Sequence, residues 1–135
     1  MRASCPIIPI AFLLLAGNAF AAEADAIFEK SVRPLLESKC FDCHSGRSDE
    51  VKGNLRLDSL EGILKGGDNG PAIVAGDVEN SFLLRALRYQ EADYQMPPSG
   101  RLPDSDLAAV ESWVKALEQA AKRPASRRTA QKKGR

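Results

Sequence analysis

The chain has 135 residues, 44% of them hydrophobic and 27% charged, which allows one domain with a modest core and excludes a second. The formal net charge of +1 hides an asymmetry, because residues 22–121 carry a net charge of −7 and residues 122–135 carry +7. The overall charge therefore indicates nothing about the partners of this protein.

The N-terminus has the pattern of a removable export signal. Arg2 supplies a positive charge, residues 7–16 form an apolar run, and residues 19–21 match a small-x-small cleavage site. The run is about half of the roughly 20 apolar residues that span a bilayer, so we do not expect a membrane anchor. Cys5 precedes the run, whereas a lipid-modified cysteine would follow it. We predict that residues 1–21 are a signal peptide and that the mature protein is exported, periplasmic or otherwise extracytoplasmic, without a transmembrane segment.

The spacing of apolar residues predicts a small, mostly α-helical domain over residues 22–121, with long loops and at most very short strands. In residues 25–39 the apolar side chains follow one helical face, and Pro34 must kink or divide this helix. The repeating positions are Phe28, Val32, Leu35 and Leu36.

Residues 52–58 alternate apolar and polar side chains but are too short for more than a brief extended piece. Asp58, with Glu61 three residues later, indicates the capped start of a short helix. Gly66-Gly67 indicates the end of that helix.

The next segment, residues 66–76, is predicted to be a loop of turn formers around a buried middle at residues 72–74. Asp77 is then expected to cap a helix from about Val78 to Tyr89. Its expected inward residues are Phe82, Leu83 and Leu87, with Arg85 and Arg88 outside or at the edge.

A loop over residues 90–102, which lacks periodicity, leads to a last helix with Asp104 as its cap and Asp106 in its first turn. Residues 122–135 are basic and lack an apolar face, so we expect a disordered tail. Such a run can contact an acidic protein or an anionic surface, is more often merely solvated, and indicates no specific nucleic acid. The expected buried face of the last helix is Leu107, Val110, Trp113, Val114 and Leu117.

The chemistry of the chain is concentrated in Cys40-Phe41-Asp42-Cys43-His44, which matches C-x-x-C-H. In this motif two thiols add to the vinyl groups of a haem and the adjacent imidazole binds the iron. Ligation becomes effectively intramolecular, so even a small domain can retain the group. We predict one covalently bound haem c, with thioethers at Cys40 and Cys43 and with His44 as an axial ligand.

Zinc and a redox-active disulfide are the alternatives for this cysteine pair. Structural zinc sites take four Cys or His ligands, whereas the mature chain has three in all. A thioredoxin-like C-x-x-C follows a strand within a βαβ pattern, but here the motif ends a predicted amphipathic helix. Both alternatives fit less well than haem.

Met96 is the candidate for the second axial position. His44 is the only histidine, which excludes bis-histidine ligation within one chain, and Met96 is the only methionine after the signal is removed. Most methionines fill gaps in a core, but Met96 lies in an aperiodic loop. Pro97-Pro98 follows it and stiffens this loop, which can hold the sulfur towards the iron.

The ordered set of motifs resembles the planctomycete-type cytochrome c domain, with a match from about Phe28 to Leu117. The resemblance implies a mostly helical, single-haem domain with Met96 as the sixth ligand. It is carried by Val32-Arg33-Pro34-Leu35-Leu36, Cys40 to His44, Gly53 to Ser59, Gly66-Gly67, Gly70-Pro71, Met96-Pro97-Pro98, and Leu102 with Trp113.

The expected function is electron transfer with unidentified redox proteins, because His44 and Met96 together leave no substrate position on the iron. The alternative is a haem-based sensor or a peroxidase-like enzyme with an open sixth position. No second histidine is available as a distal acid–base group, so we do not expect an enzyme. Weaker candidates, as hydrogen-bond donors to the haem propionates, are Asn54, Arg56, Tyr94 and Trp113.

Overall fold

The computed structural model describes the backbone of residues 16–122 and the side chains of residues 22–122. The predicted signal peptide therefore lies largely outside the described residues, as does the predicted tail beyond Lys122. The described part consists of helices, turns and loops, and its only ladder contacts are two isolated bridges, Gly67 with Gly70 and Val74 with Asp77. The prediction of a mostly α-helical domain is confirmed. Within these residues no helix is both long and apolar enough to cross a membrane.

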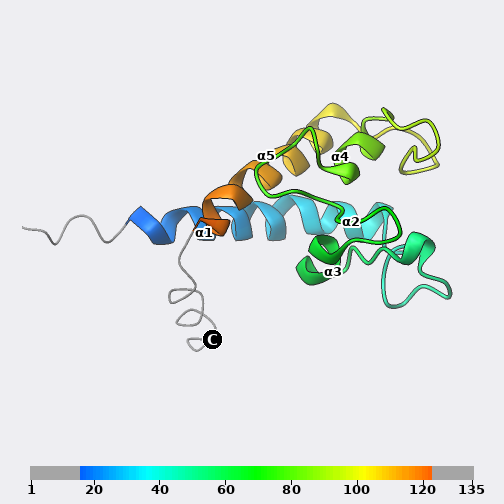
Figure 1. The fold of residues 1–135 in the computed structure, drawn as a ribbon, viewed down its shortest axis with the longest axis horizontal. Coiled ribbons are helices and arrows are strands. Elements are labelled where there is room, and N and C mark those ends of the chain that lie inside the picture. Colours follow the sequence, from blue (N-terminus) through cyan, green and yellow to red (C-terminus); the bar gives the residue numbers. More distant parts are fainter. Residues whose placement is uncertain (1–15, 123–135) are drawn as a thin grey trace, which may run out of the picture.

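The first helical run comprises α1 (Ala16–Ile27), a π-helical turn (Phe28–Val32) and α2 (Arg33–Lys39), which follow one another without a break (Figure 1). The Arg33 N–H donates to the carbonyl of Phe28, five residues back. Pro34 explains this widened turn, because proline has no N–H and its ring collides with the carbonyl four residues earlier in a regular α-helix. The predicted interruption at Pro34 thus takes the form of a π-turn.

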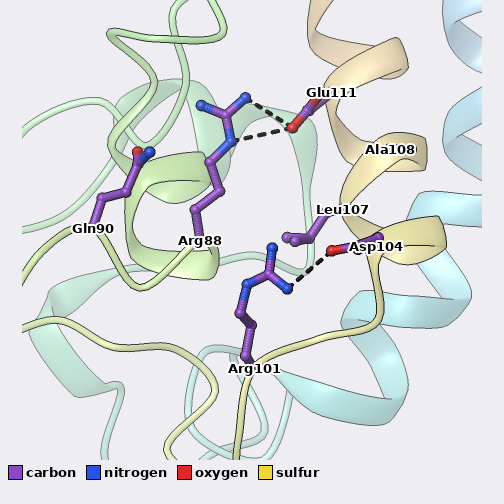
Figure 2. A pocket seen from close by; sticks show the side chains of 7 residues that line it. All are labelled: Arg88, Gln90, Arg101, Asp104, Leu107, Ala108 and Glu111. Carbon is purple, nitrogen blue, oxygen red and sulfur yellow. Dashed lines mark hydrogen bonds and ion pairs between the residues drawn. The ribbon is translucent and has the colours of Figure 1, made fainter.

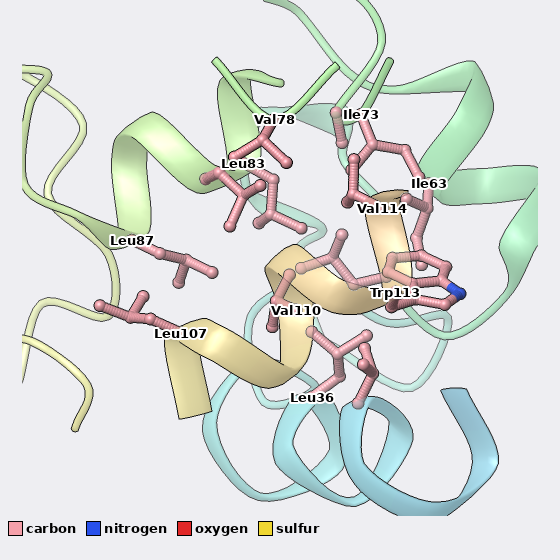
Figure 3. Packing of buried hydrophobic residues seen from close by; sticks show 14 of the residues in the cluster. Leu36, Ile63, Ile73, Val78, Leu83, Leu87, Leu107, Val110, Trp113 and Val114 are labelled. Carbon is pink, nitrogen blue, oxygen red and sulfur yellow. The ribbon is translucent and has the colours of Figure 1, made fainter. Parts of the chain in front are cut away.

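Helix α5 (Asp104–Ala121) packs against α1 and the π-turn, and runs in the opposite direction to α1 (Figure 1). The rings of Phe28 and Trp113 are 5.0 Å apart at 37°. The predicted inward face is confirmed, with Leu117 only half-buried. Figure 3 shows part of the core between these helices and the loops, which contains Leu36, Ile63, Ile73, Leu83, Leu87, Leu107, Val110, Trp113 and Val114.

The predicted cap of α5 is wrong. The cap position is held by Pro103, and Asp104 is the first helical residue, without a side-chain capping hydrogen bond. The Asp104 carboxylate instead pairs with Arg101 at 2.9 Å. Proline suits this position because its fixed φ, here −56°, leads directly into the helix.

The predicted cap of α3 (Leu60–Lys65) is off by one residue. Ser59 is the cap, because its Oγ accepts a hydrogen bond from the Gly62 N–H at 3.0 Å. Asp58 is occupied elsewhere, by the Gly46 N–H and the Arg56 guanidinium. The predicted end of the helix at Gly66 is confirmed.

The segment before α3 forms no ladder. It begins with a 3₁₀ turn (Lys52–Asn54) and continues as extended backbone from Leu55, in line with the brief extended piece that was expected. The loop after α3 buries Ala72 and Ile73, but Val74 remains 43% exposed, so the predicted buried middle is one residue too long.

Helix α4 (Phe82–Leu87) starts four residues later than predicted. Asp77 accepts from the Asn80 N–H at 3.0 Å and so caps a turn rather than the helix. The buried Ser81 hydroxyl donates to the Asp77 carbonyl at 2.6 Å and accepts from the Val74 N–H at 2.9 Å. These bonds keep the backbone before Phe82 in a turn. On α4 itself, the buried residues are Leu83, Leu84, Ala86 and Leu87, and Phe82 is half-buried.

The loops gather at the end of the molecule where α2 finishes and α5 begins (Figure 1). The predicted aperiodic loop over residues 90–102 is confirmed. This loop and the segment that follows α2 both contribute residues to one cavity, which places the two predicted ligand segments near each other.

Candidate functional site

A cavity of about 460 Å³ opens among these loops. All four predicted site residues line it: Cys40, Cys43, His44 and Met96. The volume lies within the range of cofactor and small-molecule pockets, about 300 to 1,000 Å³. The rest of the wall is largely apolar and includes Leu55, Leu57, Ala72, Phe82, Leu83, Ala86, Leu87, Pro97 and Pro98.

The C-x-x-C-H motif forms a turn that continues directly from α2. The Cys40 N–H donates to the Leu36 carbonyl at 2.8 Å, and the His44 N–H donates to the Cys40 carbonyl at 2.8 Å. The Leu57 N–H donates to the His44 carbonyl at 2.8 Å, which ties the motif to the extended segment after it. Cys40 is half-buried and Cys43 is exposed, and both are free thiols.

The His44 ring is oriented by a backbone carbonyl. Its Nδ1 lies 3.3 Å from the carbonyl oxygen of Leu55. Because a carbonyl can only accept, this contact requires the proton on Nδ1 and leaves the lone pair of Nε2 available to a metal. The half-buried imidazole is therefore held in the tautomer that an axial ligand needs.

The thiol of Cys40 has the opposite character to that of a redox-active cysteine. Burial raises the pKa of Cys40 from 9.0 to about 11, and the neighbouring Cys43 adds to the shift. Cysteines that exchange disulfides have a lowered pKa, because the thiolate is the reactive form. The electrostatics thus disfavour the thioredoxin-like alternative.

Met96 is half-buried and lines the same cavity, although it lies far from the C-x-x-C-H motif along the chain. Its N–H donates to the carbonyl of Ala86, near the end of α4, at 3.2 Å. The loop that carries Met96 is therefore attached to a helix whose Leu83 and Leu87 belong to the core.

Of the four weaker candidates for hydrogen bonds to the haem propionates, only Tyr94 lines the cavity. Trp113 is buried against Phe28 and does not line the cavity, and Arg56 pairs with Asp58 outside it. The Asn54 amide donates to Asp68 at 2.7 Å and is also absent from the wall. Tyr94 does line the cavity, is 40% exposed and packs edge-on against Phe82.

Two lysines in the wall were not predicted. Lys39 and Lys52 both line the cavity, but Asp42 and Asp68 line it as well, and Lys52 pairs with Glu50, so the wall carries both signs of charge. The one signal for Lys39 in the sequence is its position next to Cys40. The sequence gives no such signal for Lys52. Its place in the wall depends on a contact between distant residues, in which the Lys52 N–H donates to the Cys43 carbonyl at 2.9 Å.

A second hollow, of about 360 Å³, lies between the end of α4 and the start of α5 (Figure 2). Its cations are already paired: Arg88 with Glu111 at 2.8 Å and with Glu79 at 2.9 Å, and Arg101 with Asp104. The pairing with Glu111, and then with Glu79, raises the pKa of Arg88. We interpret these ion pairs as a link between α4 and α5.

Over residues 16–122 no group of three or more His, Cys, Asp or Glu side chains is arranged to hold a metal ion.

Comparison with known families bears on the cavity directly. Residues 40–100 match the family model described as planctomycete cytochrome C. The matched segment begins at Cys40 and includes Met96. It confirms the predicted resemblance over the middle part of the segment from Phe28 to Leu117. A search of curated proteins and a search of solved structures each found no match.

Proposed function

Because residues 40–100 match the planctomycete cytochrome C family, we propose that this protein is an exported, single-haem c-type cytochrome that transfers electrons. The observation that carries the proposal is the single cavity lined by Cys40, Cys43, His44 and Met96. These residues come from two segments more than fifty positions apart, and each has the side-chain chemistry that a covalently bound haem requires.

The residues of the cavity suit the group in three ways. The two thiols lie on one turn, and the half-buried Cys40, whose pKa is raised to about 11, is a protonated thiol at neutral pH and so carries the hydrogen that adds to a vinyl group together with the sulfur. The orientation of His44 by the Leu55 carbonyl leaves Nε2 for the iron. When bound, haem supplies one-electron redox chemistry, for which the apolar wall provides a site of low dielectric constant.

Ligation by His44 and Met96 would fill both axial positions, so electrons would pass without a substrate on the iron. The Met96 thioether is a neutral, soft ligand that favours ferrous iron and so raises the reduction potential.

Covalent attachment is tested by expressing the chain with a c-type cytochrome maturation system and extracting the denatured protein with acid. Wild-type protein should keep its haem, and Cys40→Ala and Cys43→Ala should each keep at most one thioether. The double variant should keep none. Cys5→Ala is the matched control and should match the wild type, because Cys5 lies in the predicted signal peptide. Release of all haem from wild-type protein would overturn the proposal.

The sixth ligand distinguishes an electron carrier from a haem sensor or a peroxidase-like enzyme. Met96→Ala should open a coordination site, so the reduced variant should bind carbon monoxide readily while the wild type binds it slowly or not at all. Its reduction potential should fall. Met96→His should restore six-coordination at a lower potential. Equal binding rates and potentials in wild type and Met96→Ala would show that Met96 is not on the iron and would favour the sensor or enzyme.

A further inference from the structure

The C-terminal end of α4 has an unusual residue at a position that glycine normally occupies. The Tyr89 N–H donates to the Ala86 carbonyl at 3.1 Å, and the Gln90 N–H donates to the Arg85 carbonyl at 2.9 Å. This pair of bonds defines a Schellman motif, in which the residue after the helix cap is left-handed. Tyr89 takes that conformation with φ 61°, which is costly for a bulky residue. The helix end alone therefore gives no reason for a tyrosine here.

The reason lies in the loop that carries Met96. The half-buried Tyr89 donates its hydroxyl hydrogen to the Pro97 carbonyl at 2.6 Å. The Met96 N–H donates to the Ala86 carbonyl at 3.2 Å. The backbone is thus anchored to the end of α4 on both sides of the Met96 side chain. Met96 and Pro97 line the cavity whereas Tyr89 does not, so Tyr89 acts on the cavity only through this loop.

We propose that Tyr89 is a positioning residue for Met96, and that its hydroxyl holds the loop where the thioether sulfur can ligate the haem iron. The inference rests on the proposed ligation by Met96. Methionine has a flexible side chain and binds as a neutral ligand, so the position of its backbone decides how often the sulfur occupies the sixth site. Loss of one of the two anchors should therefore increase the time for which that site is open.

The test compares haem-loaded wild type with Tyr89→Phe, which keeps the ring and removes only the hydroxyl. Carbon monoxide should bind to the reduced variant roughly fivefold faster, a factor that corresponds to the loss of one neutral hydrogen bond. The reduction potential should fall. Ser99→Ala is the matched control, because Ser99 lies exposed in the same loop and does not line the cavity. It should bind carbon monoxide at the wild-type rate.

The same measurement in a Met96→Ala background separates the two proposals. If Met96 is the ligand and Tyr89 acts through it, Tyr89→Phe should cause no further change in that background. If Met96→Ala already behaves as the wild type, the proposed ligation fails. If Met96→Ala opens the iron but Tyr89→Phe has the wild-type rate and potential, ligation stands and the role of Tyr89 is overturned.

Hydrogen exchange provides a readout that does not depend on the iron. The Met96 amide should exchange faster in Tyr89→Phe than in Ser99→Ala, because the anchor beside it is lost. A lower melting temperature in Tyr89→Phe, with unchanged exchange at Met96 and unchanged carbon monoxide binding, would show a purely structural role and would overturn the inference.

Discussion

The Asp58 carboxylate connects the segment after the C-x-x-C-H motif to the start of α3. It accepts hydrogen bonds from the Gly46 N–H at 2.8 Å and from the Arg56 guanidinium at 2.8 and 3.1 Å. The bond from Arg56 is the main cause, and that from Gly46 the next, of a pKa for Asp58 of about 2 instead of 3.8. Because the folded pKa is below the unfolded one, the ionised carboxylate stabilises the fold above about pH 4 and loses this effect as the pH falls to about 2.

Asp58→Asn should therefore lower the free energy of unfolding by about 1 kcal/mol at pH 7, a value reduced for the solvent exposure of Arg56. The difference from wild type should shrink towards zero as the pH is lowered to 2. Urea unfolding of the haem-loaded proteins at several pH values measures it. Asp49→Asn, at an exposed carboxylate of the preceding loop, should be nearly neutral at every pH. A loss in Asp58→Asn that does not change with pH would contradict the assignment.

At the scale of elements, the end of α3 depends on glycine for two separate reasons. Gly66 and Gly70 have φ values of 75° and 85°, in the left-handed region. A Cβ on Gly66 would lie 1.8 Å from the Gly70 carbonyl oxygen, whereas a Cβ on Gly70 would meet nothing within 4 Å. Only Gly66 is therefore required by close approach of the backbone as well as by its conformation.

Gly66 and Gly70 can therefore be compared directly, because both have a left-handed φ and only Gly66 is also in close contact with the backbone. Gly70→Ala should cost about 1 kcal/mol of stability, the usual penalty of a left-handed alanine. Gly66→Ala should cost clearly more, because the loop that contributes Gly67 and Gly70 to the cavity wall must move. It should also reduce haem incorporation. Thermal unfolding and the haem-to-protein ratio of both variants check this, and equal melting temperatures would argue against the close contact.

At the scale of the whole molecule, two regions differ in what they pack against. The first helical run and α5 bury Leu36, Val110 and Trp113, and none of these three lines the cavity. The segments that follow α2 and α4 surround the cavity instead. In a domain of this size a bound cofactor supplies a large part of the interior for such segments.

We therefore expect the apo-protein, made as the Cys40→Ala, Cys43→Ala double variant, to be ordered unevenly. Amide exchange should remain slow in α2 and α5, and should become fast over residues 40–58 and 94–98. Haem-loaded wild type should protect all these segments. Native-like protection throughout the apo-protein, with cooperative melting at the same temperature, would show that the cavity walls do not need the cofactor.

The features that the sequence by itself determined are local ones. The end of a helix just before the C-x-x-C-H motif, the apolar face of α5 and the end of α3 at Gly66 each follow from spacing within a few residues, and the structure agrees with them. The single histidine and the single methionine of residues 22–121 also limit the candidates for axial ligands of the proposed haem. Such spacing predicts local structure because helical periodicity and turn chemistry act over one or two turns.

Only the tertiary structure decided the features that depend on contacts between distant segments. The buried Ser81 hydroxyl delays the start of α4 because it bonds to the carbonyl of Asp77 and the N–H of Val74, which propensity along the chain does not reveal. The entry of Met96 into the same cavity as Cys40 and Cys43 required α4 and its loop to fold back. Spacing along the chain indicates which residues can contact each other locally, whereas packing of a shared core decides which distant residues come into contact.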